Sequence, residues 1–132
     1  MNIALIAHDN KKELMVSFCI AYKGILQKHN LYATDTTGTI VKKNTDLSIF
    51  LHSPGILGGL QQIDTRVSCG EIDLVIYFAD TMQIEGSDSP GSRQIFFNCD
   101  THNIPFATNI ATAEVLVRGL ERGDLAWREL LK

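Results

Sequence analysis

His8 and Asp9 could carry out acid–base chemistry, and they stand directly after the apolar run 3–7. A histidine in this place could polarise a carbonyl group or shuttle a proton, and the aspartate could orient it or act as a base. Both also have a plainer interpretation, in which His8 bonds to a neighbouring backbone group and Asp9 caps a helix. The pair is a candidate catalytic pair at the end of a strand.

Two further groups could hold an anion. Lys11 and Lys12 fall in the first turn of an expected helix, where the helix dipole disfavours cations and a bound anion would offset that cost. Thr36 and Thr37, followed by Gly38, place two hydroxyls and backbone N–H groups at the next expected helix start, which is the geometry that cradles an oxyanion. The alternative is that the lysines are solvated and the threonines are caps.

The glycine pair Gly58-Gly59 indicates either close approach of the backbone to a ligand or a tight entry into a helix. Leu60 follows the pair and shares a helical face with Ile63, which favours core packing. Asp64 lies one turn beyond Leu60 and is expected to be a surface carboxylate.

Five apolar segments have the pattern of strands: 3–7, 31–34, 47–51, 72–78 and 105–108. The first is apolar throughout, which is typical of a central parallel strand covered on both faces. Helical spacing occupies the intervals, beginning at Asn10, whose pairing with Glu13 is a helix-start signature. Further helices are expected through Ile40 after a polar turn at 35–38, from Gly58 onward, around 93–99, and after a cap at Thr112. Residues 85–92 are predicted to form a surface loop.

This alternation predicts an α/β fold: one Rossmann-like domain over residues 1–132, with a mostly parallel central sheet flanked by helices. Ligands of such sheets bind beyond the carboxyl ends of the strands. The residues expected at that edge are His8, Asp9, residues 34–38, Asp80 and residues 108–109.

Composition limits the function classes. Twelve basic against fifteen acidic residues give a net charge of −3, which argues against a nucleic-acid-binding protein. No apolar run reaches the length of a membrane span, and the start lacks the pattern of a signal peptide. Three widely separated cysteines predict a reduced cytoplasmic chain with small buried thiols, and His29, His52 and His102 form no set with metal-ligand spacing.

Four ordered blocks resemble the methylglyoxal synthase family. They read Ala-Leu-Ile-Ala-His-Asp-Asn-Lys-Lys from position 4, Leu-Tyr-Ala-Thr-Asp-Thr-Thr-Gly from 31, Gly-Gly-Leu-Gln-Gln from 58, and Asn-Ile-Pro-Phe-Ala-Thr-Asn-Ile-Ala-Thr-Ala-Glu from 103. The resemblance implies a Rossmann-like domain in a homohexamer that converts dihydroxyacetone phosphate to methylglyoxal and phosphate without metal or organic cofactor. Related domains without this chemistry serve as regulatory modules for small ligands.

The resemblance also assigns roles to individual residues. It matches His8 to a histidine that contacts the substrate oxygens, and Asp9 and Asp80 to two aspartates of the catalytic site. The residues that it matches to the phosphate-binding group are Lys12, Thr34, Thr36, Thr37 and Gly55.

The chain departs from the family pattern where the chemistry is done. The family reads Gly-Gly-Asp-Gln-Gln and uses that aspartate as the catalytic base, but this chain has Leu60 there. Asp35 replaces a glycine beside the anion loop, and Pro54 replaces a serine, which removes a hydroxyl and an N–H donor. The family's Pro-His-Asp-Pro-Asp loop becomes residues 87–91, where Asp88 stands for the histidine and Gly91 for the final aspartate.

The sequence therefore predicts a phosphate-type pocket with weak or absent activity, which would bind a small phosphorylated metabolite or inorganic phosphate. The alternative is an active synthase, or a lyase for another phosphorylated substrate, in which Asp64, Glu85 or Asp88 replaces the base. A third interpretation is a relic whose pocket binds nothing. Neither nucleic acid nor membrane is expected as a partner.

Overall fold

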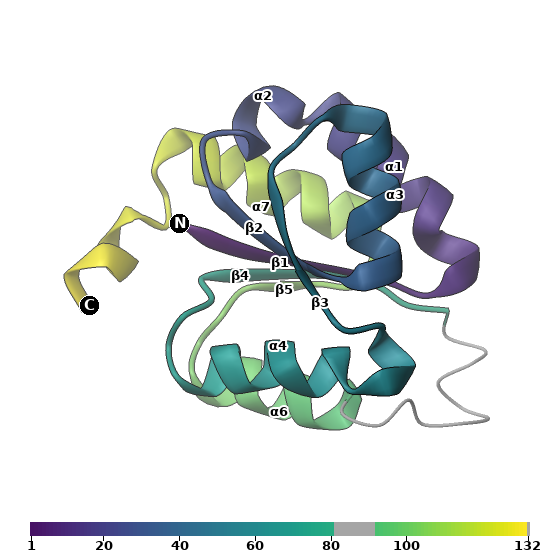
Figure 1. The fold of residues 1–132 in the computed structure, drawn as a ribbon. Helices are drawn as coiled ribbons and strands as arrows, with labels where there is room; N and C mark the ends of the chain where they lie inside the picture. The colour runs from purple at the N-terminus through teal and green to yellow at the C-terminus, as the bar shows by residue number, and fades with distance from the viewer. Residues whose placement is uncertain (81–91, 132) are drawn as a thin grey trace.

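The computed structural model describes residues 1–80 and 92–131, and Figure 1 shows one sheet between two layers of helices. The strands are β1 Asn2–Ala7, β2 Asn30–Thr34, β3 Ile49–His52, β4 Leu74–Phe78 and β5 Phe106–Ala107. Their order in the sheet is β3-β2-β1-β4-β5, and each neighbouring pair is parallel. The predicted α/β fold is confirmed.

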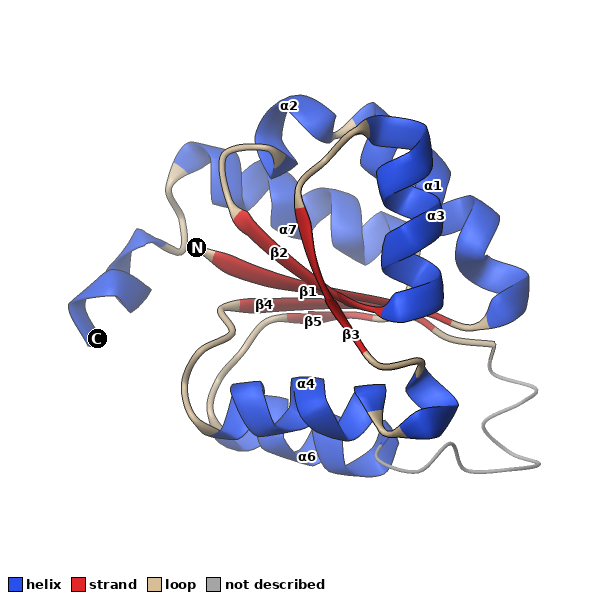
Figure 2. Cartoon of the chain, viewed as in Figure 1, coloured by secondary structure: helices blue, strands red, loops and turns tan. Residues whose placement is uncertain are grey.

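Helices cover both faces of the sheet (Figure 2). One layer holds α1 Lys12–Ala21, α2 Lys23–Leu26, α3 Asp35–Thr45 and α7 Ile110–Arg122. The other layer holds α4 Gly59–Ser68 and α6 Ser92–Thr101. The chain thus passes β1, β2 and β3 on one side and then returns past β1 to form β4 and β5.

Alternation along β1 explains why its sequence is apolar throughout. Ile3 and Leu5 pack into the core under α1, α3 and α7, whereas Ala4 and Ile6 pack into the core under α4 and α6. All four side chains are at most 4% exposed. A strand buried on both faces has no position for a polar residue, so the first polar side chain falls where the strand ends, at His8.

Two local expectations for the first half of the chain are wrong. A 3-10 turn at Asp9–Lys11 precedes α1, and Asn10 caps no helix; its amide donates to the Asp80 carboxylate over 2.8 Å. The segment 35–38, predicted as a polar turn, is the first turn of α3. Asp35 suits this position because an acidic side chain is stabilised at a helix N-terminus.

The second half differs from expectation at the last helix. Asn109, and not Thr112, caps α7: the Asn109 side-chain oxygen accepts from the backbone N–H of Thr112 over 3.0 Å. The final 3-10 helix Ala126–Leu131 was not predicted. The predicted loop 85–92 lies outside the described residues except for Ser92, which begins α6.

The final 3-10 helix is tied to the sheet through a buried ion pair. The Arg128 Nε atom lies 3.3 Å from Asp73 Oδ1, and Arg128 also donates to the Asn103 carbonyl over 2.9 Å. Asp73 is fully buried and accepts from the backbone N–H of Asn2 as well. No helix within residues 1–80 and 92–131 is long and apolar enough to cross a membrane.

Candidate functional site

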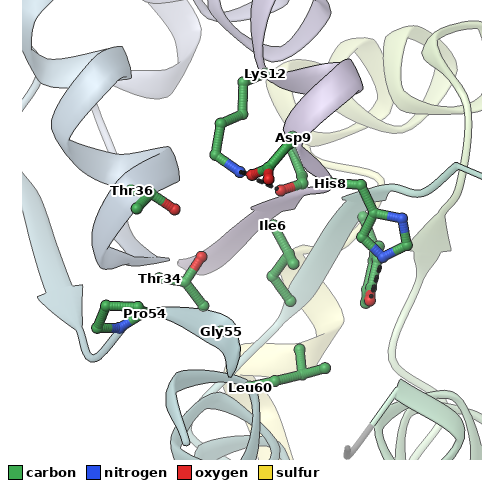
Figure 3. A pocket seen from close by; sticks show the side chains of 11 residues that line it. Ile6, His8, Asp9, Lys12, Thr34, Thr36, Pro54, Gly55 and Leu60 are labelled. Atoms are coloured by element: carbon green, nitrogen blue, oxygen red, sulfur yellow. Dashed lines mark hydrogen bonds and ion pairs between the residues drawn. The ribbon is translucent and has the colours of Figure 1, made fainter. Parts of the chain in front are cut away.

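A cavity of about 280 Å³ opens at the carboxyl ends of β1 and β2, beside the segment that follows β3 (Figure 3). This is where the strand order reverses, because β1 lies between β2 and β4. Open parallel sheets bind ligands at such a switch point. The cavity is lined by Ile6, Ala7, His8, Asp9, Lys12, Thr34, Thr36, Pro54, Gly55, Leu60 and Tyr77.

Lys12 provides the positive charge of the cavity. Its ammonium group donates to the Ala7 carbonyl over 3.0 Å and to the Asp9 carboxylate over 2.9 Å, and its side chain is 15% exposed. An ammonium group has three hydrogens, so these two bonds leave one for a ligand. The hydrogen bond from Lys12 holds the pKa of Asp9 below its ordinary value of 3.8, which keeps Asp9 charged.

Thr34 and Thr36 bring hydroxyl groups to the same side of the cavity. Thr34 ends β2 and Thr36 lies in the first turn of α3, so the N-terminus of that helix faces the space beneath Lys12 (Figure 3). The first N–H groups of a helix have no acceptor within the helix, and the positive end of the helix dipole lies at the same point; here the Asp35 N–H donates to the Ser53 carbonyl over 3.5 Å. Together with Gly55, these groups form a surface suited to an anion.

His8 lies on the other side of the cavity (Figure 3). Its Nδ1 atom accepts from the backbone N–H of Asp80 over 2.8 Å, which places the proton of the neutral ring on Nε2. Nε2 then donates to the Tyr77 hydroxyl over 3.2 Å. The Tyr77 hydroxyl keeps its own hydrogen available as a donor.

Both rings are held in their neutral forms. Burial lowers the pKa of His8 below its ordinary value of 6.5, outweighing the nearby carboxylate of Asp80, which raises it. Burial also raises the pKa of Tyr77 to about 12. At neutral pH the two side chains therefore act as hydrogen-bond donors, and neither is a strong base.

The glycine pair is explained by tight entry into α4. Gly58 adopts a left-handed conformation with φ of 99°, and a Cβ atom on Gly59 would overlap the Ser53 carbonyl oxygen. The helix therefore starts directly against the segment that carries Pro54 and Gly55. This close packing sets Leu60, the second residue of α4, at the cavity wall.

Leu60 belongs both to the cavity wall and to the hydrophobic core under α4 and α6. It lines the cavity, yet it is only 3% exposed and packs in the core with Ile6, Ile63 and Tyr77. The core role predicted from its spacing is thus confirmed. The side chain that α4 contributes to the cavity wall is therefore aliphatic: Leu60 carries no acid, base or hydrogen-bonding group.

Six of the eight predicted site residues line the cavity: His8, Asp9, Lys12, Thr34, Thr36 and Gly55. Thr37 is fully buried behind the wall, where its hydroxyl lies 3.4 Å from the Ala7 carbonyl. Asp80 lies beside His8 without lining the cavity, and Asp35 bonds to Thr39 one turn further along α3.

The substitute carboxylates are not brought to the cavity within the described residues. Asp64 is directed to α6, where its Oδ1 accepts from the Asn98 amide over 2.8 Å. Glu85 and Asp88 fall in residues 81–91, outside the described part of the chain. No group of three or more His, Cys, Asp or Glu residues that could hold a metal occurs within residues 1–80 and 92–131.

Sequence reasoning missed Tyr77, Ile6 and Ala7 as lining residues, whereas Pro54 lies in the segment where the sequence departs from the family pattern. Tyr77 pairs with Ile6 in the β1–β4 register, so both side chains lie on the sheet face toward α4. The detectable signal was a single hydroxyl in an otherwise apolar central strand. Such a hydroxyl needs a partner when it is buried, and here the partner is His8.

A parallel α/β sheet with a polar pocket at its switch point places the chain among the small Rossmann-like α/β domains, and comparison with known proteins narrows this class. A family model described as the MGS-like domain matches residues 15–108. The methylglyoxal synthase of Caldicellulosiruptor saccharolyticus is 53% identical over 131 residues, which cover 99% of this chain and 92% of that protein. That of Thermoanaerobacter pseudethanolicus is 52% identical over 130 residues, covering 98% of each.

The structural comparison agrees. The crystal structure of methylglyoxal synthase from Elizabethkingia anophelis superposes with a TM-score of 0.81 at 36% identity, covering 88% of this chain and 76% of that one. The chain belongs to the methylglyoxal synthase family.

Proposed function

We propose that this protein binds a small phosphorylated metabolite in the pocket at the ends of β1 and β2, and that it carries out the family reaction slowly or not at all. The observation behind the proposal is the composition of the wall. The anion-binding side keeps Lys12, Thr34 and Thr36, whereas Leu60 occupies the position of the family's catalytic aspartate.

The phosphate would lie between Lys12 and the first turn of α3. Lys12, with its remaining ammonium hydrogen, and Thr36, with its hydroxyl group, both line the cavity here, and the first turn of α3 begins beside them. Charge-assisted hydrogen bonds of this kind are about twice as strong as neutral ones. Asp9 is already paired with Lys12, so its charge is partly offset toward an incoming anion.

The family reaction on dihydroxyacetone phosphate needs a base that Leu60 cannot supply. A carboxylate removes a proton from the carbon next to the carbonyl, the resulting enediolate is stabilised by donors, and the C–O bond to phosphate then breaks. A positioned base contributes about 10²–10⁴-fold, or roughly 3–5 kcal/mol of the barrier. The Tyr77 hydroxyl, which accepts from His8, can still donate its own hydrogen to a ligand oxygen, which supports binding without turnover.

A second candidate is an active synthase, favoured by the 53% identity with a protein named methylglyoxal synthase. Among the lining residues the carboxylate is Asp9, whose side chain is 96% exposed and paired with Lys12. An exposed carboxylate that is paired with a lysine is poorly placed to act as the base, because proton abstraction tolerates little displacement of the base from the reacting carbon. The alternative therefore depends on Glu85 or Asp88, or on a residue of another subunit.

Methylglyoxal formation from dihydroxyacetone phosphate separates the two candidates. A true synthase, assayed beside this protein, is the control. We expect a rate at least about 10²-fold below that control, and a Leu60→Asp variant that recovers part of the difference. A rate in the ordinary enzyme range of about 1–10³ s⁻¹ in the unmodified protein would exclude the proposal of slow turnover.

Thermal unfolding with inorganic phosphate tests the binding site. A ligand that binds only the native state stabilises it, by about 2.7 kcal/mol when its concentration is 100 times Kd. Lys12→Ala should remove this stabilisation, and the exposed Lys43 in α3 provides the control variant Lys43→Ala with the same change in charge. If Lys12→Ala and Lys43→Ala respond to phosphate alike, Lys12 does not hold the anion.

Homohexameric assembly and a cytoplasmic location belong to the same proposal, the first from the family resemblance and the second from the scattered cysteines. Light scattering on the purified protein measures the assembly directly. A mass near that of one 14.6 kDa chain would contradict the hexamer.

A further inference from the structure

The two sides of the pocket differ in chemistry. Figure 3 shows Lys12 on one side and Leu60 on the opposite side, with Ile6 between them. The side near Lys12 is charged and hydroxyl-bearing, whereas Ile6 and Leu60 belong to the core under α4 and α6. A ligand whose phosphate is held at Lys12 therefore directs its other end toward aliphatic side chains.

We infer that the pocket selects a phosphorylated ligand whose far end is an unsubstituted alkyl group, and that Leu60 sets this preference. The inference rests on the proposed function, because it takes the phosphate to bind at Lys12. It names the class of ligand: a short phosphate monoester with a terminal methyl or methylene group where a triose phosphate has a hydroxymethyl group.

The expected size of the preference for an alkyl end follows from the cost of burying a hydroxyl group without a partner. A hydroxyl group buried without a partner loses its hydrogen bonds to water, and Leu60 and Ile6 offer none in return. A methyl group in the same place loses nothing of this kind and removes apolar surface from water. In proteins the unpaired hydroxyl weakens binding by about fivefold or more, and tenfold corresponds to ~1.4 kcal/mol.

The middle of the ligand meets different groups. Tyr77 accepts from His8, so its own hydrogen is available to a carbonyl oxygen in the cavity. Neutral His8 and Tyr77 favour an uncharged acceptor over a second anion, because they bring dipoles and no net charge. A ligand with a carbonyl group between its phosphate ester and a terminal methyl group therefore fits the pocket. Its carbonyl oxygen accepts from Tyr77, and its methyl group packs against Leu60 and Ile6.

Two matched ligands test the inference by calorimetry. Acetonyl phosphate is dihydroxyacetone phosphate with a hydrogen in place of the terminal hydroxyl, so the pair differs at the end that would face Leu60. We expect acetonyl phosphate to bind about tenfold more tightly than dihydroxyacetone phosphate. Inorganic phosphate is measured beside them, and methylglyoxal is monitored so that any turnover is seen.

Leu60 is tested by two substitutions. Leu60→Asn keeps the number of side-chain heavy atoms and the branch at Cγ but adds hydrogen-bonding groups without adding a base, so it should reverse the preference in favour of dihydroxyacetone phosphate. Leu60→Met keeps the wall apolar and should preserve the preference. If Leu60→Asn does not fold, the comparison of the two ligands with the unmodified protein and with Leu60→Met still decides.

The outcomes separate this inference from the proposed function. Equal binding of the two organic phosphates, or tighter binding of dihydroxyacetone phosphate, would overturn the inference while leaving the phosphate site in place. Failure of inorganic phosphate and of both organic phosphates to bind would overturn the proposed function itself. A preference unchanged in Leu60→Asn would remove Leu60 as its cause.

Discussion

Replacing Asp73 by alanine should be among the most destabilising substitutions in this protein. Asp73 is fully buried, and its carboxylate accepts from the Asn2 backbone N–H over 2.9 Å and from Arg128 over 3.3 Å. The Arg128 side chain is 9% exposed. Removing the carboxylate therefore leaves a guanidinium group buried beside an empty space, with the Asn103 carbonyl as its acceptor.

The expected loss of folding stability is large because the ion pair is buried. Breaking a buried ion pair by removing one partner costs about 3–5 kcal/mol, because the remaining charge has lost its compensation. The exposed pair Arg122–Asp124 provides the matched control, since its side chains are 61% and 55% exposed. Asp124→Ala should change the free energy of unfolding by no more than ~1 kcal/mol.

Urea unfolding followed by circular dichroism, at one fixed protein concentration, measures both variants. The double variant Asp73→Ala/Arg128→Leu removes the orphaned charge and should recover part of the loss, which gives the coupling energy of the pair. A loss of less than ~1 kcal/mol in Asp73→Ala, equal to the control, would refute the reasoning that burial makes this pair important.

Three further predictions follow from local environments. In the native protein the Cys69 thiol should react rapidly with a disulfide reagent, because Cys69 is exposed. Cys19 and Cys99 are buried, and burial raises the pKa of both thiols to about 12, so they should react only after unfolding. Rapid reaction of all three thiols in the native protein would contradict the structure. Stability should fall as pH drops below 6.5, since burial lowers the pKa of His8, His29 and His52 and the unfolded chain then binds more protons than the native one. A melting temperature that stays flat between about pH 7.5 and 5.5 would show that these rings protonate without penalty. Gly59→Ala should cost roughly 2–3 kcal/mol through overlap with the Ser53 carbonyl, measured against Gly24→Ala, whose added Cβ meets nothing within 4 Å.

The sequence predicts this fold well where burial alone decides the structure. Residues 3–7 are apolar throughout, so a central strand is the expected outcome, and the place of His8 and Asp9 follows from where that strand ends. The boundaries of helices are less predictable. Asn10 and Glu13 match a helix-start signature, but a 3-10 turn comes first and the Asn10 amide is used by Asp80, 70 residues away.

The cavity lining could be predicted where residue type and strand end coincide, as for His8 and Thr34. It could not be predicted where the partner is remote in sequence. Thr37 has the same side chain as Thr36, yet the helix turns it away from the cavity and toward Ala7. Tyr77 looked like any core aromatic, because its bond to His8 joins residues that are 69 positions apart. The exposure of Cys69 also went against the expected burial of small thiols.

Leu60 shows why stability and chemistry make opposite demands at one position. Its side chain packs among Ile6, Ile63 and Tyr77, and an ionised carboxylate at this 3% exposed site would have to be desolvated. The same desolvation raises the pKa of a carboxyl group and makes it a stronger base, so an aspartate here would help proton abstraction at the expense of folding. Under the proposed function, leucine has the opposite effect on both properties: it packs into the α4 core and leaves no proton acceptor at this position. A Leu60→Asp variant that gains activity while losing stability would fit this account, and the two measurements should therefore be made on the same preparation.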